Sequence, residues 1–233
     1  MKILAIVIAR KGSKRLKNKH HLLLNKKKII CHTLDLLKQF KNFEDVIVST
    51  NDKEIIRLTI KKYSKFIPLQ RSEKLSADSI KPYQVIRHVF KWYKNKIGDV
   101  DGIFVFQPTL PLRTKSTINN LINVFKKNNM KKSVISVTLA KEHPEWMLKI
   151  KDNTITPFIL SENFSKMSQT VNKLYRINGL GYLVLPKDIL SQNTLIPKKS
   201  IPCIVDSIFE DIDIDTKEDL LKARIFAKQL KKN

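Results

Sequence analysis

The feature that most constrains the fold is a series of short apolar runs separated by longer, helix-like segments. Runs of this kind are typical of strands buried on both faces of a sheet. They occur at ILAIVIA (3–9), DVIVST (45–50), GIFVFQ (102–107) and SVISVT (133–138), with a shorter one near residues 66–69. Between them we expect helices at residues 29–40, 52–63, 80–96 and 116–127. This alternation predicts a doubly wound α/β fold with a mainly parallel sheet and right-handed crossovers.

The pattern loosens after Thr138. Residues 143–176 hold only short strand-like pieces and loop residues, which indicates an inserted arm. Strand character returns at residues 181–186 and again at DIDID (211–215), and a closing helix is expected over 216–231. We therefore predict a single domain over residues 1–233 that carries an arm at 143–176.

The net charge of +24 points first to a polyanionic partner such as nucleic acid. Of the 45 basic residues, however, 37 are Lys and 8 are Arg, and the lysines are spread over the whole chain. Arg is the residue favoured for base readout and for clamping phosphate. We therefore attribute most lysines to a compositional drift towards Lys, Asn and Ile, and we expect no nucleic-acid partner.

The cysteine count and the apolar runs indicate in which cellular compartment the protein is expected. Cys31 and Cys203 are too few for a disulfide framework or a cysteine-based metal site. No run approaches the roughly 20 apolar residues of a membrane span, and the run Ile3–Ala9 lacks the cleavage site of a signal peptide. We expect a cytoplasmic protein without a membrane partner.

The loop after the first predicted strand is strongly basic. From Arg10 to Lys28 it contains nine Lys or Arg residues and no acidic residue. Gly12 and Ser13 could form a nest of backbone amides, which suits a triphosphate. The loop has neither the Walker A nor the GxGxxG spacing. A solvated basic loop is the alternative, but the position directly after a buried strand favours anion binding. The cations around the nest would be Arg10, Lys14, Arg15 and Lys19.

The acidic run EDIDIDTKED (210–219) lies near the other end of the chain. In a strand, alternate residues share a face, so Asp211, Asp213 and Asp215 would crowd together. Like charges this close repel one another unless a cation or a proton intervenes. Mg²⁺ commonly binds one or two carboxylates together with substrate phosphates. Helix capping is the alternative, because Asp215 and Glu218 fit a capping box, but it leaves Asp213 unexplained.

Five segments together resemble one family. VFQPTLPLR (105–113) alone would be a stiff turn that presents the Gln107 amide at the carboxyl edge of the sheet. Taken with the others, it makes the chain similar to the acylneuraminate cytidylyltransferases (CMP-sialic acid synthetases), including their legionaminic and pseudaminic acid relatives. The segments, in the order of that family, are IARKGSKRLKNK (8–19), LQRSEKLSADS (69–79), FQPTLPLR (106–113), RINGLGY (176–182) and DIDTKEDL (213–220).

The resemblance implies a nucleotide-diphospho-sugar transferase fold, a dimerisation arm and a homodimer. It also implies Mg²⁺-dependent transfer of CMP from CTP to the anomeric hydroxyl of a nonulosonic acid, with release of pyrophosphate. The residues that correspond by position are Arg10, Ser13, Lys14, Lys19, His20 and Arg71 for the nucleotide, Gln107, Arg176, Asn178 and Tyr182 for the sugar, and Asp213 and Asp215 for the metal. Among these, the resemblance makes Arg10, Lys19 and Asp213 catalytic.

Three positions depart from the family pattern. His20 stands where Asn is usual, Leu110 replaces a Ser, and Ser168 stands where sialic-acid enzymes usually carry an Arg. The last change favours a bis-acylated sugar such as legionaminic or pseudaminic acid over N-acetylneuraminate. The arm residues Phe164, Met167 and Trp146 would either line such a site or pack a dimer contact.

Three other functions were weighed against this one. A 3-deoxy-octulosonate cytidylyltransferase would share the fold, but the QPT-x-PLR segment argues against it. A basic nucleic-acid-binding protein would use the charge directly, but the chain has few arginines and no recognisable binding motif. A catalytically inactive relative would not need Asp213, Asp215 and the basic loop.

Overall fold

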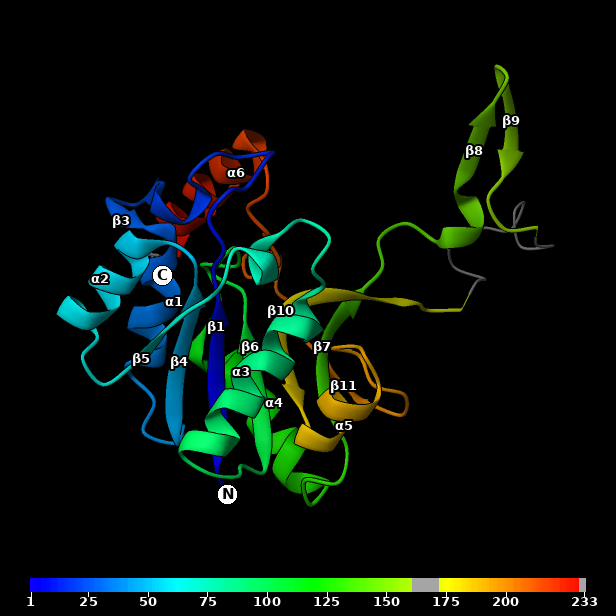
Figure 1. Cartoon of the computed structure of the whole chain (residues 1–233). Coiled ribbons are helices and arrows are strands. Elements are labelled where there is room, and N and C mark those ends of the chain that lie inside the picture. Colours follow the sequence, from blue (N-terminus) through cyan, green and yellow to red (C-terminus); the bar gives the residue numbers. More distant parts are fainter. Residues whose placement is uncertain (161–171, 231–233) are drawn as a thin grey trace.

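The computed structural model describes residues 1–160 and 172–230, which form an α/β fold around one seven-stranded sheet (Figure 1). Every neighbouring pair of strands is parallel except the two that involve β10, which is antiparallel to β6 and to β7. The predicted mainly parallel α/β fold is thus confirmed. In spatial order the strands are β11 (Ile201–Ile204), β7 (Val134–Leu139), β10 (Tyr175–Val184), β6 (Gly102–Phe106), β1 (Ile3–Ile8), β4 (Asp45–Thr50) and β5 (Ile67–Gln70).

Helices cover both faces of the sheet because alternate residues of each strand point to opposite sides. Ala5 and Val7 of β1 belong to one apolar cluster with α1 and α4, whereas Leu4 and Ile6 belong to a second cluster with α3 and α5. The α-helices are α1 (Ile29–Leu37), α2 (Lys53–Lys62), α3 (Pro82–Lys96), α4 (Lys115–Lys127), α5 (Pro186–Ser191) and α6 (Lys217–Gln229).

Helix capping agrees with the prediction at one helix and differs at another. The sequence offers either Asn51 or Asp52 as the cap of α2, and Asp52 takes this role, since its carboxylate accepts hydrogen bonds from the amides of Glu54 and Ile55. At α6 the capping box consists of Thr216 and Asp219, not of Asp215 and Glu218. The predicted Asp215–Glu218 box is therefore wrong by one residue.

Two strand predictions also need correction. Residues 211–215 form no strand, although Ile212 and Ile214 are buried as an alternating pattern requires. The strand expected at 181–186 begins earlier, at Tyr175, which lies inside the predicted arm. The short strands β2 (Leu23–Leu24) and β3 (Lys27–Lys28), the edge strand β11 and helix α5 have no counterpart among the elements expected from the sequence.

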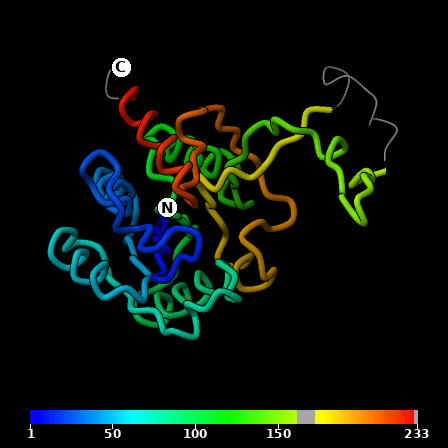
Figure 2. The backbone as a smooth tube through the Cα atoms, turned by 90° about the horizontal axis from the view of Figure 1, so that it is seen from above, coloured from blue at the N-terminus to red at the C-terminus, as the bar shows by residue number. Residues whose placement is uncertain are grey.

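A hairpin of β8 (Leu148–Lys151) and β9 (Thr154–Pro157) lies within the predicted arm. Figures 1 and 2 both show it projecting away from the body of the protein. Ile150 and Ile155 face each other across the hairpin and are 79% and 65% exposed. The arm therefore presents apolar surface that none of the residues described in the structure covers.

Cys31 and Cys203 are free and buried, in agreement with a packing role. Within the described part of the chain, no helix is long and apolar enough to cross a membrane.

Candidate active site

A cavity of about 560 Å³ opens at the carboxyl edge of the sheet, beyond the ends of β1, β5 and β6. In Figure 1 this is the edge opposite the N-terminus, where the blue segment after β1 lies beside α6. Ligands of open parallel sheets bind at such an edge. The predicted site residues that line the cavity are Arg10, Ser13, Lys14, Lys19, His20, Arg71, Gln107, Asp213 and Asp215.

The basic segment after β1 forms one wall of the cavity. Gly12 has a φ of 91°, in the region that favours glycine, so the chain can turn sharply there. Arg10 and Lys14 both bind Asp78, at 2.5 Å from Nη1 to Oδ1 and 2.7 Å from Nζ to Oδ2. Hydrogen bonds from Lys14 and Arg10 lower the pKa of Asp78. Asp78 therefore faces these two cations as an anion.

A second set of side-chain ion pairs joins the basic segment to the acidic run. Lys19 Nζ lies 2.6 Å from Asp215 Oδ1, and Arg15 binds the other oxygen of the same carboxylate. The Lys19 side chain is only 11% exposed. Asp215 is thus held towards the cavity by two cations, which leaves capping of α6 to Thr216.

Asp213 lies at the cavity wall beside Asp215. Loss of surrounding water raises its pKa, and the neighbouring charge of Asp215 raises it further, while a hydrogen bond with Thr109 opposes the shift. The amide of Ile214 donates to the carbonyl of Thr109 at 2.8 Å and so fixes the acidic run against the loop after β6. This carboxylate is the one that would gain most from a bound cation.

His20 and Arg71 are buried on the nucleotide side of the cavity. Burial, together with the charges of Lys19 and His21, lowers the pKa of His20 to about 3, so the ring is neutral at physiological pH. Its Nδ1 has no hydrogen-bond partner. Burial and the charge of Arg10 lower the pKa of Arg71 to about 10, and one of its terminal nitrogens also lacks a partner. These two polar groups remain available to a ligand.

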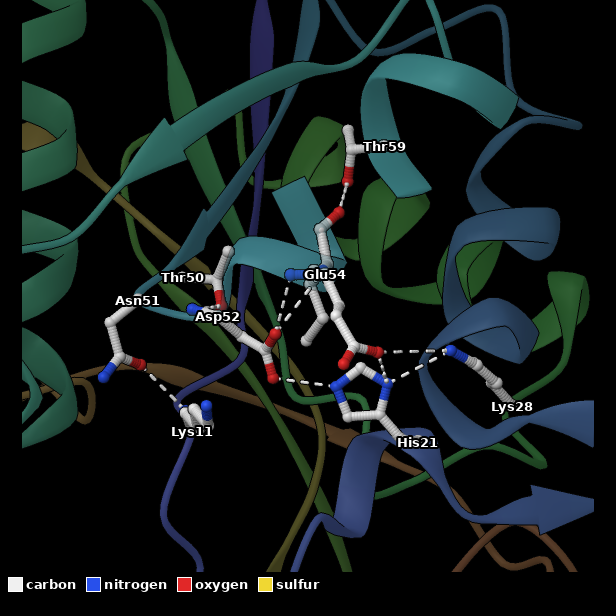
Figure 3. A network of polar contacts seen from close by, with 9 residues as sticks. Lys11, His21, Lys28, Thr50, Asn51, Asp52, Glu54 and Thr59 are labelled. Atoms are coloured by element: carbon white, nitrogen blue, oxygen red, sulfur yellow. Dashed lines mark hydrogen bonds and ion pairs between the residues drawn. The ribbon is translucent and has the colours of Figure 1, made fainter. Parts of the chain in front are cut away.

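A polar network holds the basic segment against the end of β4 (Figure 3). His21 Nε2 lies 2.7 Å from the Asp52 carboxylate, whose other oxygen caps α2. The Asn51 side chain accepts a hydrogen bond of 2.8 Å from the Lys11 amide. Lys28 and Glu54 flank the opposite nitrogen of His21, at 3.3 Å and 3.6 Å. The segment that carries Arg10 to Lys19 is thereby anchored at both ends.

A second cavity, of about 640 Å³, adjoins the first through Asp213, which lines both. Arg176 lines the second cavity, where it forms an ion pair with Asp211. Lys141 and Lys222 add two further cations to its wall. The predicted sugar residues are therefore divided, because Gln107 faces the first cavity and Arg176 the second.

Asn178 and Tyr182 line neither cavity. Both are buried in β10, where the pairing with β7 shifts register between Ile177 and Tyr182. The Asn178 Oδ1 accepts from the Leu180 amide at 3.2 Å, while its Nδ2 has no partner. Burial, and next the charge of Asp213, raises the pKa of Tyr182. Tyr182 thus lies close enough to Asp213 to sense its charge.

Two residues of the site, Asp78 and Thr109, had no role predicted from the sequence, although both lie in the quoted motifs. Arg15 was expected only as a cation of the basic loop. Only the fold reveals their partners. Asp78 binds Arg10 and Lys14, Arg15 binds Asp215, and Thr109 contacts Asp213.

The donor set for a metal is small. No group of three or more His, Cys, Asp or Glu side chains suited to a metal ion occurs among the residues that the structure describes. Asp213 and Asp215 supply carboxylate oxygens, which are the ligands that Mg²⁺ takes when substrate phosphates complete its shell. A metal at this position would therefore depend on a phosphate-bearing substrate.

The fold is that of known nucleotidyltransferases. The structure of CMP:2-keto-3-deoxy-manno-octonic acid synthetase complexed with CTP superposes with a TM-score of 0.72 at 14% identity, covering 99% of this chain and 100% of that one. The 4-diphosphocytidyl-2C-methyl-D-erythritol synthase from Anaerococcus prevotii superposes with a TM-score of 0.65 at 18% identity, covering 97% and 98%. At these identities the likeness defines the fold alone.

Sequence comparison defines the family. The cytidylyltransferase family model matches residues 4–176. CMP-N,N'-diacetyllegionaminic acid synthase of Legionella pneumophila is 32% identical over 94% of this chain and 93% of its own length. This chain belongs to the cytidylyltransferase family.

Two further relatives extend the comparison. Pseudaminic acid cytidylyltransferase of Campylobacter jejuni is 25% identical over 98% of this chain and 97% of its own. N-acylneuraminate cytidylyltransferase of Escherichia coli O18:K1:H7 is 28% identical over 94% of this chain, which spans 50% of that longer protein. The resemblance noted from the motifs is confirmed.

Proposed function

We propose that this chain transfers CMP from CTP to the anomeric hydroxyl of a nonulosonic acid and releases pyrophosphate. One observation carries the proposal: a single cavity sets the cations of residues 10–19 opposite Asp213 and Asp215, with Arg71 at its side. The family and the three relatives named above support the same chemistry. Because CTP is a cytoplasmic metabolite, the proposal implies a cytoplasmic protein.

The triphosphate would replace internal carboxylates as the partner of the cations. Arg10 and Lys14 bind Asp78, a single carboxylate that phosphate oxygens can displace. Lys19 is more buried than Arg10 or Lys14 and would neutralise charge that develops on the departing pyrophosphate. The unpartnered nitrogen atoms of His20 and Arg71 suit the polar groups of the nucleoside.

Asp213 and Asp215 would hold Mg²⁺ together with the phosphates. The metal would supply charge neutralisation at the α-phosphoryl group and a lower pKa for a coordinated hydroxyl. For its part, the chain keeps Asp213 in place through Thr109 and Asp215 through Lys19. Positioning and electrostatic stabilisation then provide most of the catalytic effect.

The sugar would bind where the two cavities meet, beside Asp213. Its carboxylate would take the place of Asp211 at Arg176, with Lys141 and Lys222 close by on the same wall. Gln107 lines the first cavity, as Asp213 does, and would contact the sugar from that side. The anomeric hydroxyl would then attack the α-phosphorus of CTP, and pyrophosphate would leave.

We further propose that the preferred sugar is bis-acylated, as in the Legionella relative. The sequence argument for this choice rests on Ser168, which lies outside the described residues, as do Phe164 and Met167. Trp146 is described and belongs to the short helical turn that precedes β8. The identity of 32% to a legionaminic acid enzyme, against 28% to an N-acylneuraminate enzyme, supports the same preference.

A pyrophosphate-release assay tests the proposed function. The enzyme would be given CTP, Mg²⁺ and, in parallel, N,N'-diacetyllegionaminic acid, pseudaminic acid, N-acetylneuraminate and 3-deoxy-octulosonate, with UTP replacing CTP as the control. We expect the highest kcat/KM with a bis-acylated nonulosonic acid. Equal or better use of N-acetylneuraminate would refute the sugar preference, and release with 3-deoxy-octulosonate alone would refute the nonulosonic acid assignment.

A further inference from the structure

The arginine at the end of FQPTLPLR has no role in the chemistry described so far. Arg113 is 4% exposed and lines neither cavity of the site. Burial lowers its pKa to about 10, so the guanidinium remains charged at neutral pH. A buried charge is costly unless hydrogen bonds and opposite charges compensate it. An apolar side chain of similar size would fill this position at lower cost, so stability alone is a poor reason for an arginine here.

The guanidinium links two segments that carry predicted sugar residues. Its Nη2 donates to the carbonyl of Gln107 at 3.3 Å, and its Nε donates to the carbonyl of Leu180. The Leu180 amide in turn donates to the Asn178 side chain. The main chains at Gln107 and at the irregular stretch of β10 are therefore held by one rigid, planar group.

The surroundings of this group leave little freedom. The guanidinium lies over the Phe106 ring, 5.2 Å from its centroid, and its Nη1 has no hydrogen-bond partner. Gly179 has a φ of 75°, and a Cβ at Gly181 would come within 2.7 Å of the Phe104 ring. The stretch that carries Asn178 and Tyr182 is thus shaped by close backbone contacts, and its main chain is held by Arg113 at Leu180 and by the Ser136 hydroxyl at Gly181.

Arg113 is also coupled to the acidic run, through electrostatic interactions. Glu210 and Asp213 are the carboxylates that favour the charged form of Arg113. Glu210 is buried and accepts hydrogen bonds from the Thr114 amide at 2.8 Å and from its hydroxyl at 3.2 Å, directly after Arg113. Arg113 therefore lies among the loop after β6, the irregular stretch of β10 and the segment that leads to Asp213.

We propose that Arg113 is a positioning residue that sets the sugar side of the site and leaves the nucleotide side unaffected. The inference rests on the proposed function and adds to it. Arg10 and Arg71 bind Ser76, Arg10 also binds Asp78, and neither arginine contacts Arg113 through a hydrogen bond or ion pair in the described part of the chain. A change at Arg113 should therefore impair use of the sugar and leave binding of CTP unchanged.

The test compares Arg113→Lys and Arg113→Met with the same changes at Arg87. Arg87 is a matched control, because it also donates through Nε to a backbone carbonyl, that of Ile189 at 2.9 Å, and lies over an aromatic ring, that of Tyr83. Both Arg113 variants should lose about 10- to 100-fold in kcat/KM for the sugar, the range expected for a charge-assisted hydrogen bond. The Kd for CTP should stay that of the wild type. The Arg87 variants should alter neither value.

An unchanged kcat/KM for the sugar in a folded Arg113→Lys enzyme, or equal changes for the sugar and for CTP, would overturn the inference. If Arg113→Met does not fold, the inference is tested with Arg113→Lys alone and with a double-mutant cycle that combines Arg113→Lys and Asn178→Ala. Positioning through Asn178 requires effects that do not add, whereas additive effects contradict it. Failure of this inference can be distinguished from failure of the proposed function. A wild-type enzyme that binds CTP but uses no nonulosonic acid would refute the proposed function itself.

Discussion

Lys19 and Asp215 form an ion pair of 2.6 Å across 196 residues of sequence, and this contact joins the two ends of the chain in one site. The lysine comes from the segment after the first strand, and the aspartate directly precedes the last helix. Neither residue could form this site alone. The predictions that follow test what each part of the site contributes.

Asp213→Asn should lose most of the turnover while the fold is retained. The change removes a carboxylate whose pKa is raised by partial desolvation and by the charge of Asp215, so a bound cation would stabilise its charged form. Loss of such a metal ligand should cost on the order of 10²-fold or more in kcat. Steady-state kinetics at saturating CTP and Mg²⁺, with circular dichroism for the fold, provide the measurement. Asp99→Asn, at an exposed ion pair with Lys94, is the control. Near-wild-type turnover in folded Asp213→Asn would exclude the assignment.

Asp78→Asn should bind CTP several-fold more tightly than the wild type. Asp78 binds Arg10 and Lys14, so the triphosphate has to displace it. The carboxylate is exposed, which keeps the expected gain modest. Isothermal titration with CTP at low ionic strength measures the effect, and the gain should shrink as salt is added. Weaker binding by the variant would show that Asp78 organises the site and does not compete with the phosphates.

His20 predicts a specific acid sensitivity. Its pKa is about 3 in the folded protein and 6.5 in the unfolded chain, because burial disfavours the charged ring. Below pH 6.5 the unfolded state binds a proton that the folded state does not, so stability falls as pH falls towards 3. The loss should be about 1.4 kcal/mol per pH unit within this window.

His20→Asn removes the titrating group and places the residue usual in the family at this position. Its free energy of unfolding, relative to the wild type, should rise by about 2 kcal/mol between pH 6.5 and pH 5. Urea unfolding at a series of pH values measures this difference. His88→Asn, at an exposed histidine of α3, is the control and should follow the wild type. Parallel curves for His20→Asn and the wild type would contradict the buried neutral ring.

The sequence could predict those strands of the sheet that are buried on both faces, because packing alone determines their apolar pattern. Strands such as Ile3–Ile8 are buried on both faces, so their apolar runs are continuous. Asp52 could be predicted as a helix cap because its amide partners are local. In contrast, Tyr175 and Arg176 are polar and exposed, so the start of β10 has no apolar signal.

The acidic run shows why the rest could not be predicted. Both Asp215–Glu218 and Thr216–Asp219 have the spacing of a capping box, and local sequence cannot choose between them. The choice depends on Arg15 and Lys19, which hold Asp215 in the cavity. A partner 196 residues away from Asp215 therefore decided the outcome, and at Arg113 the partner Leu180 is 67 residues away.

The net charge leads to a prediction about nucleic acid. If most lysines are compositional, random duplex DNA should bind weakly and the complex should dissociate at moderate salt. Binding that depends on released counterions falls steeply between about 50 mM and about 200 mM salt. Fluorescence polarisation with a labelled duplex at both salt concentrations gives the answer. Tight binding that persists at the higher concentration would restore the nucleic-acid alternative.

The hairpin of β8 and β9 should mediate a homodimer. It projects from the body in both views, and its apolar residues Ile150 and Ile155 remain largely exposed. A two-stranded hairpin is marginally stable by itself, so an exposed one with apolar side chains gains most from a partner surface. We propose that this surface belongs to a second copy of the chain.

The double change Ile150→Lys and Ile155→Lys should convert a dimer to a monomer in light scattering coupled to gel filtration. Ile60→Lys, at a residue of α2 that is 59% exposed, adds a charge elsewhere and should leave the dimer intact. A wild-type protein that is monomeric at micromolar concentration, or a double variant that remains dimeric, would show that the arm has another role.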